Sequence, residues 1–312
     1  MKILLIETSS TDNPNGVVVH VRNSIVLNQY LSRNNDCRLV YKESEILDIN
    51  EQFDIIIFIS ATFYFKYERF LELIGNQKHC KVGWISNEID LFANDWLKKR
   101  GFDFMIANFE EHGVKDAHRV YKDYLMANLN ALQTKPRNLN IEKRYDCIQY
   151  STYRKWREKY YQKYLIKDMI LSTSSKNVKK FILAGCDCWW ISSLNWEQGQ
   201  ETLNLFRGSL FLEDTITHKV FNHLANRFYE ALYCNCAVFF DKTCINTIKK
   251  SGYFIDDYFL VDSYDELMYK VKNMKEDILE EFLDVNTALA IKDKETTLNN
   301  IENFLKDRIN KD

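Results

Sequence analysis

Short, almost continuously apolar runs recur along the first half of this chain, separated by longer amphipathic stretches. The apolar runs are expected to be strands, at Lys2–Glu7, Cys37–Tyr41, Asp54–Ser60, Lys81–Ser86 and Asp103–Asn108. A strand that is apolar on both faces belongs in a parallel sheet covered by helices on both sides. Helical stretches such as Val17–Arg33 and Tyr64–Asn76 lie between them, so the pattern predicts a series of β-α-β units and a doubly wound domain.

The same pattern restarts in the second half of the chain. A polar segment at Asn130–Arg144, which holds one of the two prolines, is the expected linker. Ser263 and Glu266 have the spacing of a capping box, which marks a helix start. The other elements expected here are strands at Tyr145–Ser151, Lys179–Gly185, Gly208–Asp214, Ala237–Asp241 and Tyr258–Asp262, and helices at Arg154–Ile170 and Glu295–Asn310.

These two series predict an α/β chain with two Rossmann-like, doubly wound domains that face a central cleft. The expected domains are 1–138 and 139–292, and a C-terminal helix at 293–312 is expected to pack back toward the first domain. The length of 312 residues and the apolar content of 46% suffice for two cores. Nine glycines and two prolines are too few for a loop-rich sandwich or a disordered tail.

The N-terminal sequence and the eight cysteines bear on location. The apolar run in MKILLIETSS is too short for a signal peptide, and no stretch approaches the roughly 20 apolar residues that cross a bilayer. We therefore expect a cytoplasmic, reducing compartment, no membrane partner, and thiols that are mostly free and buried. The pairs Cys186/Cys188 and Cys234/Cys236 could join in a zinc site, but they lack the usual C-x-x-C spacing, so no metal site is predicted.

Charge is distributed unevenly along the chain. The net charge of −2 by itself indicates neither a nucleic-acid, a membrane nor an acidic partner. Residues 143–180, however, contain eleven Lys and Arg against three acids, Asp146, Glu158 and Asp168. This segment is either a solvated helix face or a surface for a polyanion.

The segment NRFYEALYCNCAVFFD, residues Asn226–Asp241, joins a polar helix to a buried strand. Arg227 and Glu230 are three residues apart and therefore lie on one helical face. A carboxylate has two acceptor oxygens that match the two hydroxyls of a ribose, and a guanidinium suits a phosphate. A helix end at the cleft adds a favourable dipole for a nucleotide. The alternative is an ordinary surface ion pair between the two side chains.

This segment resembles the late helix–strand motif of GT-B glycosyltransferases, in which the acid binds the donor ribose. Asn235 stands here where glycine is common. A wider resemblance covers most of the chain. The segments MKILLIE, FDIIIFIS, KVGWISNEIDLFANDW, YDCIQYSTYRKWREKY, SLFLED and the tail YFLVDSYDELMYKVKNMKEDIL follow the order seen in phage DNA β-glucosyltransferases. The resemblance implies a GT-B fold with an N-terminal acceptor domain and a C-terminal nucleotide-sugar domain.

The resemblance also implies an activity. It is the transfer of glucose from UDP-glucose to a hydroxymethylated pyrimidine in duplex DNA, with inversion at the sugar carbon, by a monomeric hexosyltransferase in the cytoplasm of a phage-infected cell. Donor binding needs no metal because arginines and helix dipoles replace it, whereas Mg²⁺ can assist product release. Two alternatives stay open: a GT-B enzyme with a carbohydrate, lipid or protein acceptor, and an inactive protein that binds a nucleotide sugar or DNA.

By resemblance, the donor site lies in the second domain. Arg154 and Arg157 of STYRKWREKY match residues that hold the donor pyrophosphate, and Ser151 ends the preceding strand beside them. Two guanidiniums after a strand form a forked anion site, which agrees with this role. Arg154 could instead form a surface pair with Glu158, four residues later.

Asp214 closes the expected strand in SLFLED and matches an acid near the glucose hydroxyls. A carboxylate at the carboxyl end of a parallel strand points into the cleft of such a fold, which agrees with the role. Its alternative is a helix N-cap.

Inverting transfer needs a base that removes the proton of the acceptor hydroxyl. By resemblance, this base is an acid that follows a first-domain strand. Matching from the start of KVGWISNE selects Glu88, whereas matching from Trp96 selects Asn87, which cannot act as a base. We therefore expect Glu88 to be the base, with Asp90 as the next candidate. His20 is an independent candidate, because other GT-B enzymes place a catalytic histidine in that region.

Overall fold

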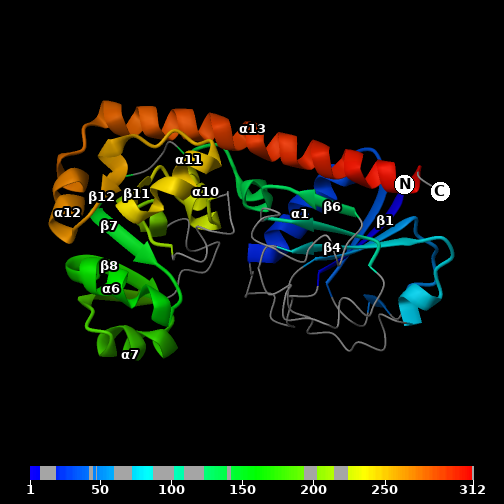
Figure 1. The fold of residues 1–312 in the computed structure, drawn as a ribbon, viewed down its shortest axis with the longest axis horizontal. Coiled ribbons are helices and arrows are strands. Elements are labelled where there is room, and N and C mark those ends of the chain that lie inside the picture. The colour runs from blue at the N-terminus through cyan, green and yellow to red at the C-terminus, as the bar shows by residue number, and fades with distance from the viewer. Residues whose placement is uncertain are drawn as a thin grey trace. The chain divides into compact units, whose positions relative to one another are not determined.

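The computed structural model describes residues 1–7, 19–41, 45–46, 48–59, 72–86, 102–108, 123–138, 142–192, 202–213 and 224–310. The chain divides into two compact units, Met1–Gln133 with Lys292–Asp312, and Thr134–Ile291. Within the described residues, each unit contains one six-stranded sheet with flanking helices (Figure 1). The predicted α/β class, with two Rossmann-like domains and a C-terminal helix, is confirmed.

The sheet of the first unit has the order β2-β1-β3-β4-β5-β6, and all its strand pairs are parallel. Five strands match the predictions to within one residue at each end. The sixth, β6, was not expected from the sequence, because DYLM is short and half-exposed at the sheet edge. The strands are β1 (Lys2–Glu7), β2 (Asp36–Val40), β3 (Ile55–Ile59), β4 (Lys81–Ser86), β5 (Phe104–Ala107) and β6 (Asp123–Met126).

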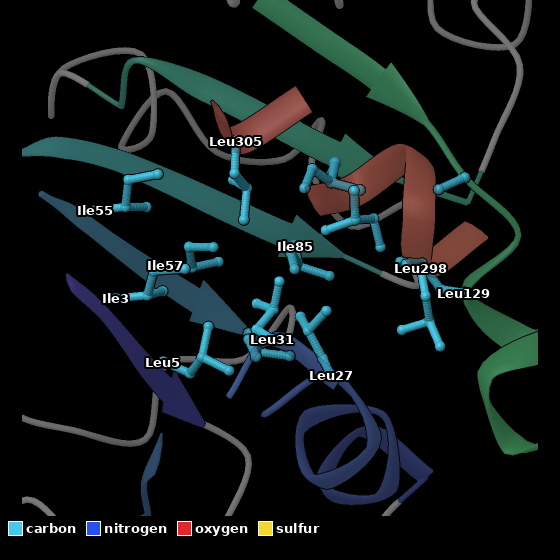
Figure 2. Packing of buried hydrophobic residues seen from close by; sticks show 14 of the residues in the cluster. Ile3, Leu5, Leu27, Leu31, Ile55, Ile57, Ile85, Leu129, Leu298 and Leu305 are labelled. Atoms are coloured by element: carbon cyan, nitrogen blue, oxygen red, sulfur yellow. The ribbon is translucent and has the colours of Figure 1, made fainter. Parts of the chain in front are cut away.

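One face of this sheet is covered by α1 (Val19–Leu31) and by the end of α13 (Glu276–Ile309), as Figure 2 shows. Ile3 and Leu5 are two apart on β1 and therefore share this face. Full burial of one such side chain contributes about 1.5–3 kcal/mol, so a few of them hold a distant helix on the sheet. The α13 side chains in this core are Leu298, Ile301 and Leu305, at the three- and four-residue spacing of one helical face.

Helix α13 begins well before the predicted start at Glu295. No glycine or proline interrupts the sequence from Glu276 to Ile309, so nothing ends the helix between them. Glu276 and Asp277 in its first turn favour the positive end of the helix dipole. The longer helix contributes to both compact units, because the boundary at Ile291 falls inside it.

Gly83 in β4 is required by close packing. It lies opposite Phe104 of β5, and a Cβ atom at position 83 would overlap the buried Phe104 ring. Any larger residue would displace that ring from the core.

The sheet of the second unit has the order β12-β11-β10-β7-β8-β9 and is also parallel throughout. Taken in chain order from β7, this is the strand order 3-2-1-4-5-6 of a dinucleotide-binding Rossmann fold. The strands are β7 (Tyr145–Tyr150), β8 (Ile166–Thr173), β9 (Asp187–Ser192), β10 (Phe206–Phe211), β11 (Ala237–Asp241) and β12 (Leu260–Val261). The α-helices are α6 (Glu158–Tyr164), α7 (Ser175–Leu183), α10 (Asn226–Tyr233), α11 (Ile245–Ser251) and α12 (Tyr264–Asn273), and the 3₁₀ turns include η4 (Lys155–Arg157), η5 (Lys242–Cys244) and η6 (Asp257–Phe259).

The prediction of a strand at Lys179–Gly185 is wrong, because most of this segment belongs to α7. Its apolar run is not a buried strand: Phe181 is buried, whereas Ile182 and Leu183 are exposed. A short apolar run does not distinguish a strand from a helix that buries one side.

The predicted helix at Arg154–Ile170 is also too long. The chain forms η4 and α6, and then β8 starts at Ile166. Lys167 has a φ of 52°, and the pairing of β8 with β9 shifts between Lys167 and Ile170. This irregular start hides the strand, because it breaks the alternation by which a strand is recognised.

The predicted linker at Asn130–Arg144 is only partly an open connection. Its first residues lie in the buried turn η3 (Leu129–Gln133). The Arg137 side chain is buried too: Nε donates to Asn235 Oδ1 at 2.7 Å, and Nη2 donates to Glu280 Oε2 at 2.9 Å. Asn235 has a φ of 50°, in the left-handed region that asparagine tolerates. Asn235, at the position where glycine is common, therefore adopts the left-handed conformation of the turn and also forms a hydrogen bond with Arg137.

The predicted capping box at the start of α12 is confirmed in its first half, since Ser263 Oγ accepts the Glu266 backbone N–H at 3.1 Å. The second half is displaced by one residue, because Glu266 Oε2 accepts at 2.8 Å from the N–H of Asp262, the residue before the N-cap. None of the described helices has both the length and the apolar character needed to cross a membrane.

Candidate functional site

The strand order of the second unit reverses between β7 and β10. Chain order runs from β7 outward through β8 and β9, and then returns to β10 on the other side of β7. In open parallel sheets, ligands bind outside the carboxyl ends of the strands at such a switch point. Residues that follow β7 and β10, together with the start of α10, therefore define the candidate site.

Three charged side chains meet at this point. Arg157, in η4 after β7, places Nη2 at 2.6 Å from Glu213 Oε2. Arg227, in the first turn of α10, donates from Nη2 to the other carboxylate oxygen, Glu213 Oε1, and to the Leu212 carbonyl at 3.2 Å. One carboxylate thus holds two guanidiniums, each through its own oxygen. We call these three residues the Arg–Glu–Arg cluster.

The Arg–Glu–Arg cluster is largely withdrawn from water. The side chains of Arg157, Glu213 and Arg227 are 13%, 5% and 17% exposed. Within these three side chains one carboxylate pairs with two guanidiniums, and a buried charge is costly unless it is paired. Guanidiniums bind phosphate oxygens through their fork of N–H donors, so an anionic group such as a phosphate suits this point.

Helix α10 is fixed to β7 beside the cluster. The Tyr150 hydroxyl donates to the Arg227 carbonyl at 2.9 Å, and the Arg227 guanidinium lies 5.4 Å from the centre of the Phe211 ring. Burial raises the pKa of Tyr150 well above its ordinary value, and the charge of Glu230 raises it further. Glu230 lies one helical turn from Arg227 on α10. Within the described residues, Arg227 forms its ion pair with Glu213, so the alternative of a simple Arg227–Glu230 surface pair does not hold.

Arg154 and Ser151 lie on the same segment after β7, outside the cluster. Arg154 is exposed, and its guanidinium stacks over the Trp156 ring at 5.8 Å from the centroid. Its backbone N–H donates to the Tyr161 hydroxyl at 3.2 Å. The Ser151 carbonyl accepts from Thr173 Oγ1 at 2.8 Å, which ties the end of β7 to β8.

The alternative pairing of Arg154 with Glu158 is not seen in the part of the chain that the structure describes. The Glu158 carboxylate accepts instead from the Tyr153 hydroxyl. That hydrogen bond raises the pKa of Tyr153 to about 12, because it stabilises the protonated phenol.

The remaining predicted site residues are not described in full. Glu88, Asp90 and Asp214 lie outside the described residues. The His20 backbone lies in the first turn of α1, and its side chain is outside the described part. The roles assigned to these four residues stay predictions.

Sequence reasoning passed over Glu213, the residue before the predicted Asp214. Two adjacent acids end SLFLED, and successive side chains of a strand point to opposite faces. Which of the two acids meets Arg157 and Arg227 depends on where β10 ends, and this could not be read from the sequence. The sequence contained one indication that Glu213 belongs to the site, namely two adjacent acids at the end of a predicted parallel strand.

A second acid, Glu7, lies at the corresponding point of the first unit. That sheet reverses its order between β1 and β3, and Glu7 at the end of β1 pairs in register with Ile59 of β3. The Glu7 side chain is fully buried and accepts from the Ser24 hydroxyl of α1. Burial raises the pKa of Tyr41, and the charges of Glu7 and Glu45 raise it further.

The cysteines do not assemble into a metal centre. All eight are free thiols, and five of them are buried. Burial raises the pKa of Cys186 to about 12 and of Cys236 to about 11, so these thiols stay protonated near neutral pH. Within the described residues, no group of three or more His, Cys, Asp and Glu side chains could hold a metal ion.

Comparison with known proteins identifies the fold. No protein-family model and no curated protein matches the sequence. Among solved structures, T4 phage BGT in complex with UDP-glucose is similar with a TM-score of 0.71 and 14% identity, covering 98% of this chain and 99% of that chain. T4 phage BGT in complex with UDP and Mn²⁺ gives a TM-score of 0.68 and 15% identity, with the same coverage.

An α-glucosyltransferase in complex with UDP and a 13-mer DNA that contains an HMU base is similar as well. Its TM-score is 0.65 at 11% identity, over 97% of this chain and 99% of that chain. The resemblance to phage DNA glucosyltransferases is thus confirmed at the level of the fold. The chain has the two-domain GT-B fold of these glucosyltransferases.

Proposed function

We propose that this protein is a UDP-sugar-dependent glycosyltransferase that transfers glucose to a hydroxymethylated pyrimidine in DNA. The single observation that carries the proposal is the convergence of Arg157 and Arg227 on Glu213 at the switch point of the second sheet. This arrangement puts two guanidiniums and a helix start where a Rossmann-type domain binds the phosphates of a nucleotide.

We assign the donor roles as follows. Arg157 and Arg227 bind the diphosphate of UDP-glucose with the N–H donors that Glu213 does not use. Glu230, one turn further along α10, accepts hydrogen bonds from the two ribose hydroxyls. Arg154 is exposed on the adjoining segment and approaches the diphosphate from the solvent side. Ser151 contributes its hydroxyl, and Asp214 binds the glucose hydroxyls.

The acceptor assignment is supported by what the similar structures bind. BGT was solved with UDP-glucose, and the α-glucosyltransferase with UDP and DNA containing an HMU base. The reaction proposed for this chain is a single inverting displacement. The hydroxymethyl oxygen of the acceptor attacks C1 of glucose, the C1–O bond to UDP breaks, and UDP leaves with the bonding electron pair.

The base takes the hydroxyl proton during this attack. We assign this role to Glu88, with Asp90 and His20 as the other candidates. Mg²⁺ would assist UDP release by offsetting the charge of the diphosphate, although among the described residues no cluster of His, Cys, Asp and Glu could hold it. The described residues agree with a donor site in which phosphate charge is met by arginines, since Glu213 is already occupied by two guanidiniums.

A direct test measures UDP release from UDP-glucose with three DNA duplexes, containing hydroxymethylcytosine, hydroxymethyluracil or no modified base. Turnover with one modified duplex and none with the unmodified duplex is the expected result. Turnover only with a saccharide, lipid carrier or protein would contradict the DNA acceptor. UDP binding without turnover on any acceptor would contradict the catalytic part and leave a nucleotide-sugar-binding protein.

The Arg157→Ala and Arg227→Ala variants connect such a result to the cluster. Each is expected to weaken UDP binding by about 2 kcal/mol, because each removes a charged hydrogen-bond donor. The matched control is Arg144→Ala, since Arg144 is exposed and its side chain, in the described part of the chain, is bonded only to Glu142. Equal UDP affinity in all three variants would contradict the proposed donor site.

A further inference from the structure

A group of exposed cations covers α7 and η4 in the second unit. Lys176, Lys179 and Lys180 are exposed and stand at the three- and four-residue spacing that brings them to one side of α7. Arg154 and Lys155 are exposed at η4. We call these five residues the basic face.

The two elements form one surface because they are packed together. The Phe181 ring of α7 contacts the Tyr153 ring before η4, with centroids 5.3 Å apart, and the Tyr161 ring of α6, with centroids 4.8 Å apart. Figure 1 shows α7 next to α6 and β8. The buried side of α7 is thus directed at this aromatic cluster, which leaves its lysines on the opposite side.

The α7 lysines of the basic face differ from nearby lysines in whether a carboxylate pairs with them. Lys163 pairs with Asp241 and Asp262, and Lys167 pairs with Asp265. Among the described residues, no carboxylate forms an ion pair with any lysine of α7. Three exposed cations on one helix face repel one another, so an external polyanion would stabilise them.

The neighbouring strand β9 carries large exposed aromatic rings. Trp189 and Trp190 are 71% and 49% exposed on β9, the last strand of the sheet on this side, and as successive strand residues they point to opposite faces of the sheet. One of the two indoles therefore lies on the side of the sheet that α7 occupies. An aromatic ring and lysines on one surface are the combination that binds nucleic acid strands, because bases stack on the ring and phosphates bind the cations.

We propose that the basic face, extended by the one of Trp189 and Trp190 that shares its side of the sheet, is a DNA-binding surface. Its lysines contact the phosphate backbone, and that indole ring stacks on a nucleotide that is not base-paired. This inference rests on the proposed function, which it deepens by naming the part of the second unit that holds the acceptor strand. It also accounts for the basic composition of residues 143–180, which donor binding through Arg154 and Arg157 does not explain by itself.

The test compares the Lys179→Glu/Lys180→Glu variant with a Lys249→Glu/Lys250→Glu control. The control changes charge equally at two adjacent exposed lysines on α11. Binding of a labelled, unmodified oligonucleotide of about 20 nucleotides, single-stranded or duplex, is measured over a salt series. The α7 variant is expected to bind at least about tenfold more weakly, and its log–log salt slope is expected to fall by about 2, one unit for each lost phosphate contact.

The tryptophans are tested with Trp189→Ala/Trp190→Ala, which is expected to weaken single-stranded binding several-fold more than duplex binding. UDP affinity is expected to stay at the wild-type value in all these variants. If the donor site were wrong, UDP binding would fail in the wild type, whereas DNA binding would still respond to the α7 variant.

Three results would overturn the proposal. Equal DNA affinity in the α7 and α11 variants would show that the α7 lysines do not contact DNA. Absence of DNA binding by the wild type would show that the protein has no DNA-binding surface. A concentration-dependent dimer, seen by sedimentation and abolished by Trp189→Ala/Trp190→Ala, would assign the surface to a second copy of this chain.

Discussion

Arg157 and Glu213 form an ion pair across the switch point of the second sheet, with Nη2 and Oε2 2.6 Å apart, although 56 residues separate them in sequence. Each follows a different strand, β7 or β10, and these two strands are neighbours only because the chain returns to the middle of the sheet. Glu213 also binds Arg227, so one buried carboxylate sets the position of both guanidiniums.

Replacing Glu213 with Gln keeps its size but removes the charge that holds the two arginines. We expect the free energy of unfolding to fall by about 3 kcal/mol, because two buried cations lose their partner. We also expect the ratio of UDP affinity to uridine affinity to fall about tenfold, since only the diphosphate contacts depend on the arginines. Calorimetric titration with both ligands measures this ratio.

Glu158→Gln is the matched control for this variant, because Glu158 adjoins Arg157 in sequence but is bonded to Tyr153. An unchanged ratio in Glu213→Gln, together with lower stability, would reduce Glu213 to a structural role. Tighter UDP binding would mean that the carboxylate competes with the diphosphate.

Glu230 is expected to bind the donor ribose. Glu230→Ala is predicted to weaken UDP binding by about 1–3 kcal/mol, because two hydrogen bonds to a charged group are lost. The same change should weaken binding of 2′-deoxy-UDP less, because that nucleotide has only the 3′-hydroxyl contact to lose. Competition binding with the two nucleotides gives the result, and an equal loss for both would argue against a contact to the 2′-hydroxyl.

Asn235 combines a left-handed backbone with a hydrogen bond to Arg137. Asn235→Ala is expected to destabilise the protein by about 2–3 kcal/mol, since it adds backbone strain and removes a buried hydrogen bond. Asn235→Gly avoids the strain and should cost only about 1 kcal/mol. Urea unfolding compares the variants. If the two substitutions cost the same, the backbone conformation is not a source of strain.

Asp241 makes stability depend on pH. Burial favours its neutral form, but hydrogen bonds from Thr243, Tyr164 and Lys163 outweigh this effect and hold the pKa of the carboxyl below its ordinary value of 3.8. A lowered pKa in the folded state contributes stability above the unfolded value of about 3.9, and this contribution is lost as the pH falls through the folded value.

The Asp241→Asn variant should therefore be less stable than the wild type at pH 7, by about 2 kcal/mol. The difference should shrink below about pH 4, where the wild-type carboxyl takes up its proton. Urea unfolding over a pH series checks this, and a difference that stays constant down to acid pH would contradict the lowered pKa.

The catalytic base can be assigned by a series of three variants, Glu88→Gln, Asp90→Asn and His20→Ala. Substitution of the residue that removes the acceptor proton should lower kcat by about 10²-fold or more with little change in donor affinity, because this residue acts only on the transferred proton. Single-turnover rates and UDP binding together give this separation. Near-normal kcat in all three variants would mean that another group is the base, and Glu7 would be tested next.

The apolar runs of the sequence predicted five strands of the first sheet and four of the second, and missed β6, β8 and β9. Segments such as Ile55–Ile59 and Ala237–Asp241 are apolar on both faces, and such a run has few stable places other than the middle of a covered sheet. The same reasoning failed at Lys179–Gly185, where apolar residues are exposed on a helix, and at β8, whose start is irregular. Local hydrophobicity reports burial but does not say which element is buried.

The candidate site, too, was predictable from the sequence only in part. The sequence predicted that Arg157, by resemblance, and Arg227 and Glu230, by type and spacing, bind a nucleotide. Their meeting on Glu213 was decided only by the tertiary structure. It depends on which strands become neighbours and on where β10 ends, and both are set by packing between segments far apart in the chain, which a local pattern does not contain.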